Sequence, residues 1–474
     1  MNKSSQQGSR NRRTFIKQSA IVSLGFLALA RCSNGPRPEA KGKAPGLASA
    51  GTSKIQLQSD SEGYLDLPEG FSYRVISRQG QRMSDGFLVP ARPDGMGTFD
   101  GGNGKVVIVR NHENSPNDSN LGPFGERNEL LDQIDSAKLY DAGKLKKPGR
   151  GGTTTLVYDE EREELEQQFL SLAGTYRNCA GGITPWNSWL TCEEDTTLKK
   201  GTIEKDHGFV FEVPARVEPG VADPLPITAM GRFNHEAVVV DPKTGIVYQT
   251  EDEGDGLIYR YIPNVPGQLL QGGRLQALVI IDQPGFDTRN WKERSMELRQ
   301  QLKVGWIDLE EVLSPEDDLR YRGFEAGAAR FARGEGMWFG NNEFFFACTN
   351  GGPKKWGQVF RYQPSPLEGK PGEKEQPATL ELYAESTDRE LLNMCDNLTI
   401  APWGDVILCE DNGQRNHIRG INKNGEIYNF ACNRSSRSEF AGLVFSPSGK
   451  TLFVNVQENG DTLAITGPWD SLMV

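Results

Sequence analysis

The sequence predicts an all-β protein, a six-bladed β-propeller with short helical insertions. Three observations support this prediction. The 474 residues include 54 glycines and 27 prolines, so turns are frequent and long helices are few. Several segments repeat one plan, an apolar run, a turn and a second strand that ends in polar residues. Further strands with alternating apolar and polar side chains follow these repeats, as they do in propeller blades.

The first 53 residues have the composition of an export signal followed by a linker. Arg12 and Arg13 precede an apolar stretch over residues 20–30, which is the twin-arginine export pattern of bacteria. This stretch is shorter than the roughly 20 residues that span a bilayer. We therefore expect residues 1–32 to be a signal segment that the twin-arginine export machinery recognises. Residues 33–53 are rich in Pro, Gly, Ser and Lys and are expected to form a flexible linker.

The same region indicates where the mature protein is located. Residues 28–30 fit a cleavage site, and Cys32 is an alternative point of lipid attachment, although Arg31 stands where a lipoprotein signal has a small residue. No later apolar segment reaches transmembrane length, so we expect no transmembrane helix in the mature chain. We expect residues 54–474 to form a single β-propeller catalytic domain, exported as a monomer to the periplasm or the extracellular space.

Self-similarity predicts the number of blades. Four copies of the repeat cover residues 178–194, 234–252, 333–350 and 395–411, a fifth covers 440–455, and a weaker sixth ends at 107–113. Three pairs of residues in these copies are each separated by 13 positions: Cys179 and Cys192, Glu335 and Cys348, and Asp396 and Cys409. A β-sandwich is the alternative, but it does not require the same polar residues to recur at matched positions.

Each copy is expected to be a hairpin with a turn such as residues 241–245. Third strands are predicted at residues 208–214, 256–263 and 357–362. Two insertions have a helical pattern, a short one at residues 128–134 and a longer one at 291–302 that continues at 309–313. We expect these insertions to lie at the rim of the propeller or to cover its site.

The polar residues of the repeats should face one space, because the innermost strands of a propeller border a central channel. These positions hold Asn111, His112, Glu113, Cys192, Glu193, Glu194, His235, Glu236, Glu251, Asp252, Arg333, Glu335, Asp396, Asn397, Glu410 and Asp411. So many carboxylates would repel one another unless cations neutralise them, so the sequence predicts bound metal. The net charge of −11 argues against nucleic acid as a partner.

The residue types indicate which metals are bound. Carboxylate and amide oxygens suit calcium, whereas a cysteine thiolate suits zinc or iron. The sequence contains no Cys-x-x-Cys and no His-Glu-x-x-His motif of a zinc site. Two glutamates follow Cys192, so a role as a metal ligand is favoured for this cysteine. For Cys348 and Cys409, packing between blades is favoured. Glu193 and Glu194 alternate along a strand, so only one of them should point inward.

Arg333 is the single cation among these positions. A guanidinium beside carboxylates can pair with a neighbouring acid, and it is equally suited to bind phosphate through two hydrogen bonds. The residue pattern alone leaves both roles open. His207 and His417 are interpreted as blade or loop residues.

Several motifs in combination resemble the PhoX-type alkaline phosphatases of bacteria over about residues 60–474. Besides the twin-arginine signal, they are residues 110–113, 191–194, 231–236, 333–336, 396–398 and 440–442. The resemblance implies a six-bladed propeller around iron(III) and calcium ions. Two features depart from the family pattern: the chain is shorter than the larger members, and Gly334 stands where proline often separates the arginine and the glutamate.

The resemblance also implies roles for single residues. Cys192 would bind iron, Asp396 or Asn397 would contact calcium, and Arg333 would bind the substrate phosphate. The full set of predicted metal ligands is Cys192, Glu194, Glu236, Glu335, Asp396, Asn397, Glu113 and Glu251, and the predicted catalytic residues are Arg333 and Asn111. The predicted function is hydrolysis of small phosphate esters by a metal-dependent phosphomonoesterase. The alternatives are a calcium-dependent lactonase or phosphotriesterase-like propeller, or a non-catalytic binding propeller.

Overall fold

β-Strands are the main regular secondary structure in the part of the chain that the computed structural model describes, residues 55–115 and 121–472. The predicted signal segment, the predicted linker and Cys32 lie outside these residues. The described residues belong to one compact unit, Ala50–Val474, and the predicted domain boundaries stay a prediction. Within the described ranges, no helix has the length and apolar character needed to cross a membrane.

Four of the five hydrogen-bonded sheets have the size of a propeller blade or slightly more. One sheet holds β4 (Pro93–Gly102), β5 (Lys105–His112), β6 (Gly151–Asp159) and β7 (Glu164–Thr175), and the next holds β8 (Asn178–Ile183), β9 (Ser188–Glu193) and β10 (Val210–Pro214). A third has the order β1 (Leu57–Gln58), β2 (Leu65–Pro68), β23 (Ile427–Asn433), β22 (His417–Ile421), β21 (Val406–Glu410) and β20 (Cys395–Ile400). The fourth holds β24 (Phe440–Phe445), β25 (Thr451–Val456), β26 (Asp461–Thr466) and β3 (Ser72–Arg78).

The fifth sheet is larger and contains nine strands. Its order is β11 (His235–Val240), β12 (Val247–Glu251), β13 (Ile258–Pro263), β14 (Gly273–Ile280), β15 (Gln301–Asp308), β19 (Ala378–Glu385), β18 (Gln358–Gln363), β17 (Glu343–Cys348) and β16 (Gly334–Gly340). Antiparallel pairing of β15 with β19 joins what would otherwise be two separate sheets. The all-β prediction is therefore confirmed, but four blades and one fused sheet replace the six separate blades that the repeats predicted.

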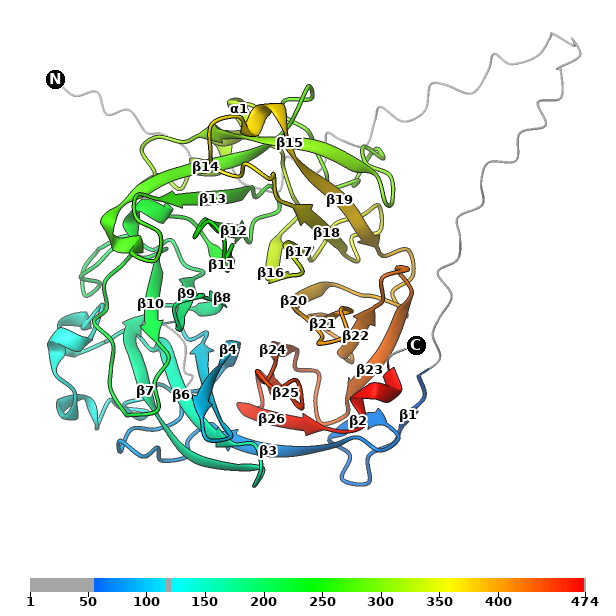
Figure 1. The fold of residues 1–474 in the computed structure, drawn as a ribbon. Helices are drawn as coiled ribbons and strands as arrows, with labels where there is room; N and C mark the ends of the chain where they lie inside the picture. The colour runs from blue at the N-terminus through cyan, green and yellow to red at the C-terminus, as the bar shows by residue number, and fades with distance from the viewer. Residues whose placement is uncertain (1–54, 116–120, 473–474) are drawn as a thin grey trace, which may run out of the picture. The chain divides into compact units, whose positions relative to one another are not determined.

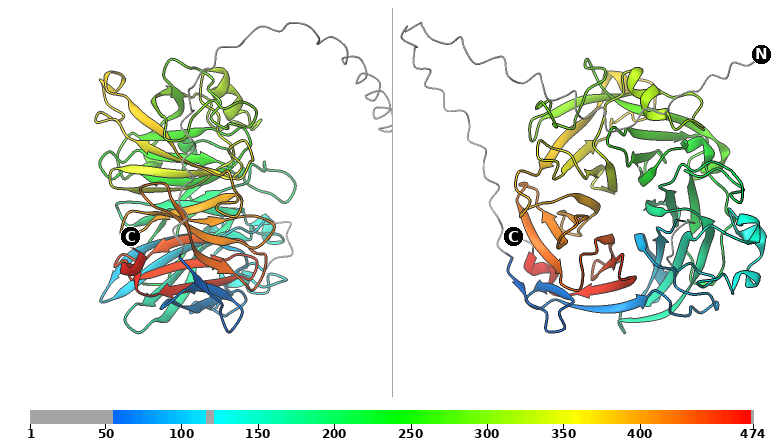
Figure 2. Two further views of the ribbon diagram at one scale, coloured as in Figure 1. Left: turned by 90° about the vertical axis from the view of Figure 1, so that its right-hand side faces the viewer. Right: turned by 180° about the vertical axis from the view of Figure 1, so that it is seen from behind.

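The sheets are arranged around a common centre in a propeller-like ring (Figure 1). Each sheet contributes one inner strand, and the nine-stranded sheet contributes two, so that the ring is lined by β4, β8, β11, β16, β20 and β24. Every inner strand lies against the next one, and β24 lies against β4, which closes the ring. Figure 2 shows the same ring from behind.

Strands from the two ends of the described chain complete the outer sheets. β3 pairs with β26, where Val75 lies opposite Leu463. β2 pairs with β23, where Leu65 lies opposite Asn433. Because these pairs cover backbone groups that would otherwise form exposed edges, they hold the ring closed.

Local sequence explains the hairpins. In the predicted turn between β11 and β12, Asp241 accepts hydrogen bonds from the Lys243 amide (2.9 Å) and the Thr244 hydroxyl (2.7 Å). Gly245 follows with a φ of +73°, a left-handed conformation that glycine adopts without strain. Aromatic residues then pack between hairpins, as Tyr248 of β12 does against Phe344 of β17, with 4.6 Å between ring centroids.

The helical insertions differ from those predicted. The α-helix of the described residues is α1 (Leu319–Glu325), and short 3₁₀ turns are η1 (Leu131–Gln133), η2 (Ser136–Lys138), η3 (Gly143–Leu145), η4 (Thr228–Met230), η5 (Leu269–Gln271), η6 (Glu373–Glu375) and η7 (Trp469–Leu472). The prediction for residues 291–302 and 309–313 is wrong, because neither segment is helical. The side chain of Asn290 accepts hydrogen bonds from the backbone amides of Ser295 and Met296, which replaces helical bonding there.

Candidate metal centre

The second residue of five inner strands carries a side chain that can bind metal: Asp94, Cys179, Glu236, Glu335 and Asp396. In all five strands the pairing with the next strand shifts register at this point. Such a β-bulge redirects a side chain and is common beside active sites. The bulges therefore bring side chains from separate sheets to one end of the channel.

Three sets of ligand atoms lie together at this end, and within each set the atoms are within 4.8 Å of one another. The sets are Glu113, Cys179 and Glu194; Glu236, Glu335 and Asp396; and Asp396, Asp411 and Glu439. We call the first set the cysteine group. The second and third sets share Asp396 and together form the acidic group.

Buried negative charge dominates the acidic group. Burial, together with repulsion from neighbouring carboxylates, raises the pKa values of Glu236, Glu335 and Asp396 well above their usual range. The pKa of Glu439 is raised in the same way, by burial and then by Asp411. In addition, Glu236 Oε2 is buried and has no hydrogen-bond partner among the described residues. Buried carboxylate oxygens without partners are costly, so this arrangement favours a bound cation.

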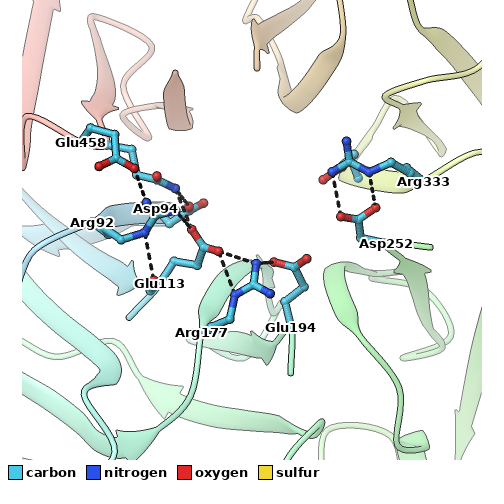
Figure 3. A network of polar contacts seen from close by, with 10 residues as sticks. Arg92, Asp94, Glu113, Arg177, Glu194, Asp252, Arg333 and Glu458 are labelled. Atoms are coloured by element: carbon cyan, nitrogen blue, oxygen red, sulfur yellow. Dashed lines mark hydrogen bonds and ion pairs between the residues drawn. The ribbon is translucent and has the colours of Figure 1, made fainter. Parts of the chain in front are cut away.

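Arginines neutralise the cysteine group instead (Figure 3). Arg177 Nη2 lies 2.7 Å from Glu113 Oε1 and 2.7 Å from Glu194 Oε2, and Arg92 binds the other oxygen of Glu113. Burial acts to raise the pKa of Glu113, but the two guanidinium groups hold it below its usual value. The thiol of Cys179 has a pKa well above its usual value, because of burial and the carboxylates around it.

Arg333 lies on the other side of the centre, with its side chain 29% exposed (Figure 3). Its Nε and Nη2 lie 2.7 and 2.8 Å from the two oxygens of Asp252, and Nη2 also lies 3.0 Å from Glu335 Oε1. Among the described residues, Nη1 has no hydrogen-bond partner. Arg333 therefore pairs with acids, as one of the two sequence interpretations expected, and still presents a donor to the channel.

The structure contradicts the ligand prediction for Glu251. This residue is fully buried, and its Oε2 accepts hydrogen bonds from the Tyr259 hydroxyl (2.7 Å) and the Leu257 amide (3.1 Å). Burial raises its pKa to about 8. The residue that follows, Asp252, is the one that reaches Arg333. Glu251 therefore closes the loop after β12 and does not line the channel.

Glutamates in two other sheets have the same structural role. Glu193 accepts a hydrogen bond from the Gly208 amide (2.9 Å), and Glu410 accepts one from the Asn393 amide (2.9 Å). In both cases the next residue faces the centre, Glu194 in one sheet and Asp411 in the other. The sequence left open which of Glu193 and Glu194 points inward, and the structure shows that Glu194 does.

The ligand prediction for Cys192 is also contradicted. Its thiol is buried in an apolar cluster that includes Leu190, Val210 and Ile227. Burial alone raises its pKa, and no charged neighbour contributes. The cysteine beside the carboxylates is Cys179, 13 positions earlier in the repeat. The repeat could have identified Cys179, because Cys179 precedes Cys192 by 13 positions, as Asp396 precedes Cys409, so that Cys179 and Asp396 occupy equivalent positions.

Asn111, predicted to be catalytic, has a structural role. Its side chain donates hydrogen bonds to the carbonyl oxygens of Cys179 (2.9 Å) and Ala180 (2.7 Å). It accepts hydrogen bonds from Trp189 (2.8 Å) and Thr191 (2.8 Å). Because these four bonds use both of its polar atoms, Asn111 fixes the backbone around Cys179 and is not placed to meet a substrate.

Asn397, a predicted ligand, is likewise occupied elsewhere. Its Oδ1 accepts a hydrogen bond from the Leu443 amide (3.0 Å), which ties β20 to β24. Asp396 is the member of this pair that lies in the acidic group.

The structure therefore brings together five of the eight predicted ligands, Glu113, Glu194, Glu236, Glu335 and Asp396, and their binding of metal stays a prediction. The prediction did not assign a role to Asp94, Cys179, Arg92, Arg177 or Glu439. Asp94 and Glu439 stand at the starts of the inner strands β4 and β24, where the weaker copies of the repeat gave little alignment. Neither Arg92 nor Arg177 belongs to the repeated pattern, so no sequence signal marked these two arginines.

Comparisons with known proteins identify the family to which the chain belongs. A family model described as alkaline phosphatase PhoX matches residues 52–168 and 158–460, whereas no curated protein matches the chain significantly. Similar solved structures include a gluconolactonase from Xanthomonas campestris, XC5397, with 10% identity, a TM-score of 0.38 and coverage of 85% of this chain and 97% of that chain. They also include the periplasmic gluconolactonase PpgL from Pseudomonas aeruginosa, with 12% identity, a TM-score of 0.38 and coverage of 84% and 92%. These values are too low to support an argument about function. The family model, in contrast, spans well over half of the sequence, and the chain therefore belongs to the alkaline phosphatase PhoX family.

Proposed function

We propose that this protein is an exported, metal-dependent phosphomonoesterase that hydrolyses small phosphate esters and releases inorganic phosphate. The observation that supports this proposal most is the acidic group, in which carboxylates from different sheets meet in two sets that share Asp396, with the ligand atoms of each set within 4.8 Å of one another. Among the described residues, Arg333 is the one cation in contact with this group. Membership of the PhoX family supports phosphate ester hydrolysis as the chemistry.

The residues present fit the proposed metals, iron(III) and calcium. The unpartnered oxygen of Glu236 and the other carboxylates of the acidic group would hold calcium, which prefers oxygen ligands. The thiol of Cys179, with Glu113 and Glu194, would hold iron, which accepts sulfur ligands. When bound, these ions would supply the positive charge that polarises a phosphoryl group.

Arg333 would bind the phosphoryl oxygens. Its pairing with Asp252 and Glu335 fixes the guanidinium, and Nη1 remains to donate a hydrogen bond into the channel. A fixed cation of this kind stabilises the negative charge that develops on a phosphoryl group during transfer.

Three further features belong to the same proposal. We interpret β11–β14 and β16–β19 as two blades joined by β15, which would make six blades in all. We propose export through the twin-arginine route to the periplasm or beyond, on the basis of residues 1–32. We also propose that the mature chain is a monomer, which light scattering can test.

The test is hydrolysis of 4-nitrophenyl phosphate by the purified, metal-loaded protein, before and after chelation. Arg333→Ala should lower kcat by about 100-fold or more while iron and calcium stay bound, as elemental analysis would show. Arg322→Ala in α1 is the matched control, because its guanidinium pairs with Asp318 (3.0 Å) outside the centre. Unchanged turnover in Arg333→Ala would reject the assigned role.

The same preparation separates the alternative functions. Iron together with calcium, and activity that chelation abolishes, supports the phosphomonoesterase. Hydrolysis of gluconolactone by a protein that holds calcium without iron would favour the lactonase. A stable protein without stoichiometric metal and without hydrolysis would favour a binding propeller.

A further inference from the structure

A polar pocket of about 310 Å³ lies beside the metal centre but outside it. The loop before β20, the loop between β21 and β22, and β22 itself form its walls. Its charged lining residues are Arg389, Glu390, Glu410, Arg415 and Arg419, and Asn393 and His417 lie among them. We call it the outer pocket.

The outer pocket has an excess of positive charge. Its buried carboxylate, Glu410, is already paired with Arg419, whose Nε lies 2.8 Å from Glu410 Oε1. Arg389 lies 3.7 Å from Glu390, but both side chains are more than half exposed, so this pair contributes little. Arg415 has no ion pair or hydrogen bond among the described residues. Three arginines against two glutamates therefore leave a positive excess that can attract an anion, in a chain whose net charge is −11.

The outer pocket and the acidic group share one wall. Glu410 lines the pocket, and the next residue, Asp411, belongs to the acidic group. Asn393 lines the pocket three positions before Asp396, so their Cα atoms are at most about 11 Å apart. The two segments are held together by a hydrogen bond from the Asp411 amide to the Met394 carbonyl (2.9 Å). The outer pocket therefore adjoins the acidic group, and these two segments form the wall between them.

We propose that the outer pocket binds a second anionic group on the substrate. This inference rests on the proposed phosphomonoesterase function and defines its substrate class: phosphate monoesters whose leaving group carries a carboxylate or a second phosphate. In the reaction, the water oxygen forms a bond to phosphorus as the P–O ester bond breaks. A proton from the water passes to the leaving oxygen, and the second anion stays unchanged. Arg415 and Arg389 would determine specificity without contacting the reacting atoms.

Two substrates of matched shape test the proposal: 4-carboxyphenyl phosphate and its neutral amide, 4-carbamoylphenyl phosphate. In the metal-loaded protein we expect kcat/KM to be about fivefold to tenfold higher for the carboxylate, as one charge-assisted contact supplies. Arg415→Gln should remove this preference and leave kcat/KM for the amide unchanged. Arg389→Gln, made separately and combined with Arg415→Gln, shows how the two arginines share the effect.

Arg437→Gln is the matched control, because Arg437 is an exposed arginine on a neighbouring loop that does not line the outer pocket. A loss of preference in this control equal to that in Arg415→Gln would indicate a general charge effect and overturn the proposal. Equal kcat/KM for both substrates in the parent protein would overturn it as well, while leaving the phosphomonoesterase function intact. A third substrate, 1,4-phenylene bisphosphate, shows which anionic group the outer pocket prefers. If its kcat/KM is higher than that of 4-carboxyphenyl phosphate, the preferred group is a second phosphate.

A binding measurement keeps the pocket testable if the protein hydrolyses none of these esters, which would overturn the proposed function. Calorimetry with 4-carboxyphenylphosphonate, which is not hydrolysed, should then give about fivefold weaker binding in Arg415→Gln than in the parent. Equal affinity in the two proteins would overturn the outer pocket as an anion site.

Discussion

The two sides of the metal centre balance their buried negative charge in different ways. In the cysteine group, Arg177 bridges Glu113 and Glu194, and Arg92 binds Glu113 from the other side (Figure 3). The acidic group contains five carboxylates, and among the described residues Arg333 alone contacts it as a cation. The cysteine group therefore has two arginines beside the iron proposed for it, whereas the acidic group has one arginine for five carboxylates and would depend mainly on ions from solution.

This difference predicts that the stability of the folded protein depends on metal at the acidic group more than at the cysteine group. A guanidinium is present whenever the chain is folded, so the cysteine group should tolerate metal removal. The acidic group would then keep buried like charges close together, which raises pKa values or destabilises the fold. Five variants can break or sharpen this comparison.

Asp396→Asn should have the largest effect, because Asp396 belongs to both sets of the acidic group. We expect loss of at least one calcium ion per chain and a thermal midpoint lowered by at least about 5 °C in the metal-loaded protein. In chelator at pH 9 the sign should reverse, since the variant has one repelling charge fewer. Elemental analysis and calorimetry measure both effects. Asp100→Asn, an exposed site near the opposite end of β4, is the control, and an unchanged calcium content in Asp396→Asn would contradict the comparison.

Cys179→Ser and Cys192→Ser form a matched pair that separates ligand from core. The first should lose its iron, because a thiolate becomes a hydroxyl in the cysteine group. The second should keep its iron and lose about 1–3 kcal/mol of unfolding free energy, because a hydroxyl enters an apolar cluster. Iron content and denaturant unfolding measure these results. If Cys192→Ser lost its iron and Cys179→Ser kept it, Cys192 would be the iron ligand and the assignment of Cys179 would be wrong.

Arg177→Gln tests the built-in cation. Removing its charge leaves Glu113 and Glu194 with less compensation, so the metal-free protein should lose about 1–3 kcal/mol of unfolding free energy, an effect moderated by the partial exposure of Arg177. This sign is opposite to that expected for Asp396→Asn at high pH. Arg74→Gln, whose arginine is 64% exposed in its pair with Glu163, is the control and should change stability by less than about 1 kcal/mol. A metal-free Arg177→Gln as stable as its parent would contradict the role.

His207→Asn should have an effect that depends on pH and that is the smallest of the five above about pH 9. Despite burial, Glu193 and Asp141 raise the pKa of His207 to about 9, above the value of about 6.5 expected for the unfolded chain. The stabilisation from protonated His207 is therefore complete below about pH 6.5 and is lost as the pH rises through about 9. A rise in pKa from about 6.5 to about 9 corresponds to about 3 kcal/mol, so the variant should be less stable than its parent by up to that amount at pH 6, with the difference shrinking towards pH 10. Unfolding curves across this range measure it, and a constant difference would exclude protonation as the cause.

The repeats in the sequence predicted the hairpins and most of the acidic residues, but some side chains were assigned to the centre in place of others that face it. The sequence pattern predicted Glu251 as a ligand, but the next residue, Asp252, faces the centre. It predicted Cys192 as a ligand, but Cys179 lies beside the carboxylates. Because side chains alternate along a strand, an error of one position moves a residue from the channel to the interior of a sheet. Asn111 has a polar side chain at a repeat position, and only its four hydrogen bonds show that it is structural.

The chain composition, the repeated hairpins and the family motifs already establish an all-β protein with carboxylates drawn from several repeats. The positions of Glu236, Glu335 and Asp396 depend on the bulges at the starts of β11, β16 and β20, which add a residue that no hydrophobic pattern reveals. Arg92 and Arg177 become counterions of Glu113 only because β4 pairs with β5 and β8 packs against both strands, and β15 joins two sheets only through its pairing with β19. These contacts join residues far apart in the chain, and long-range pairing of this kind leaves no trace in local periodicity.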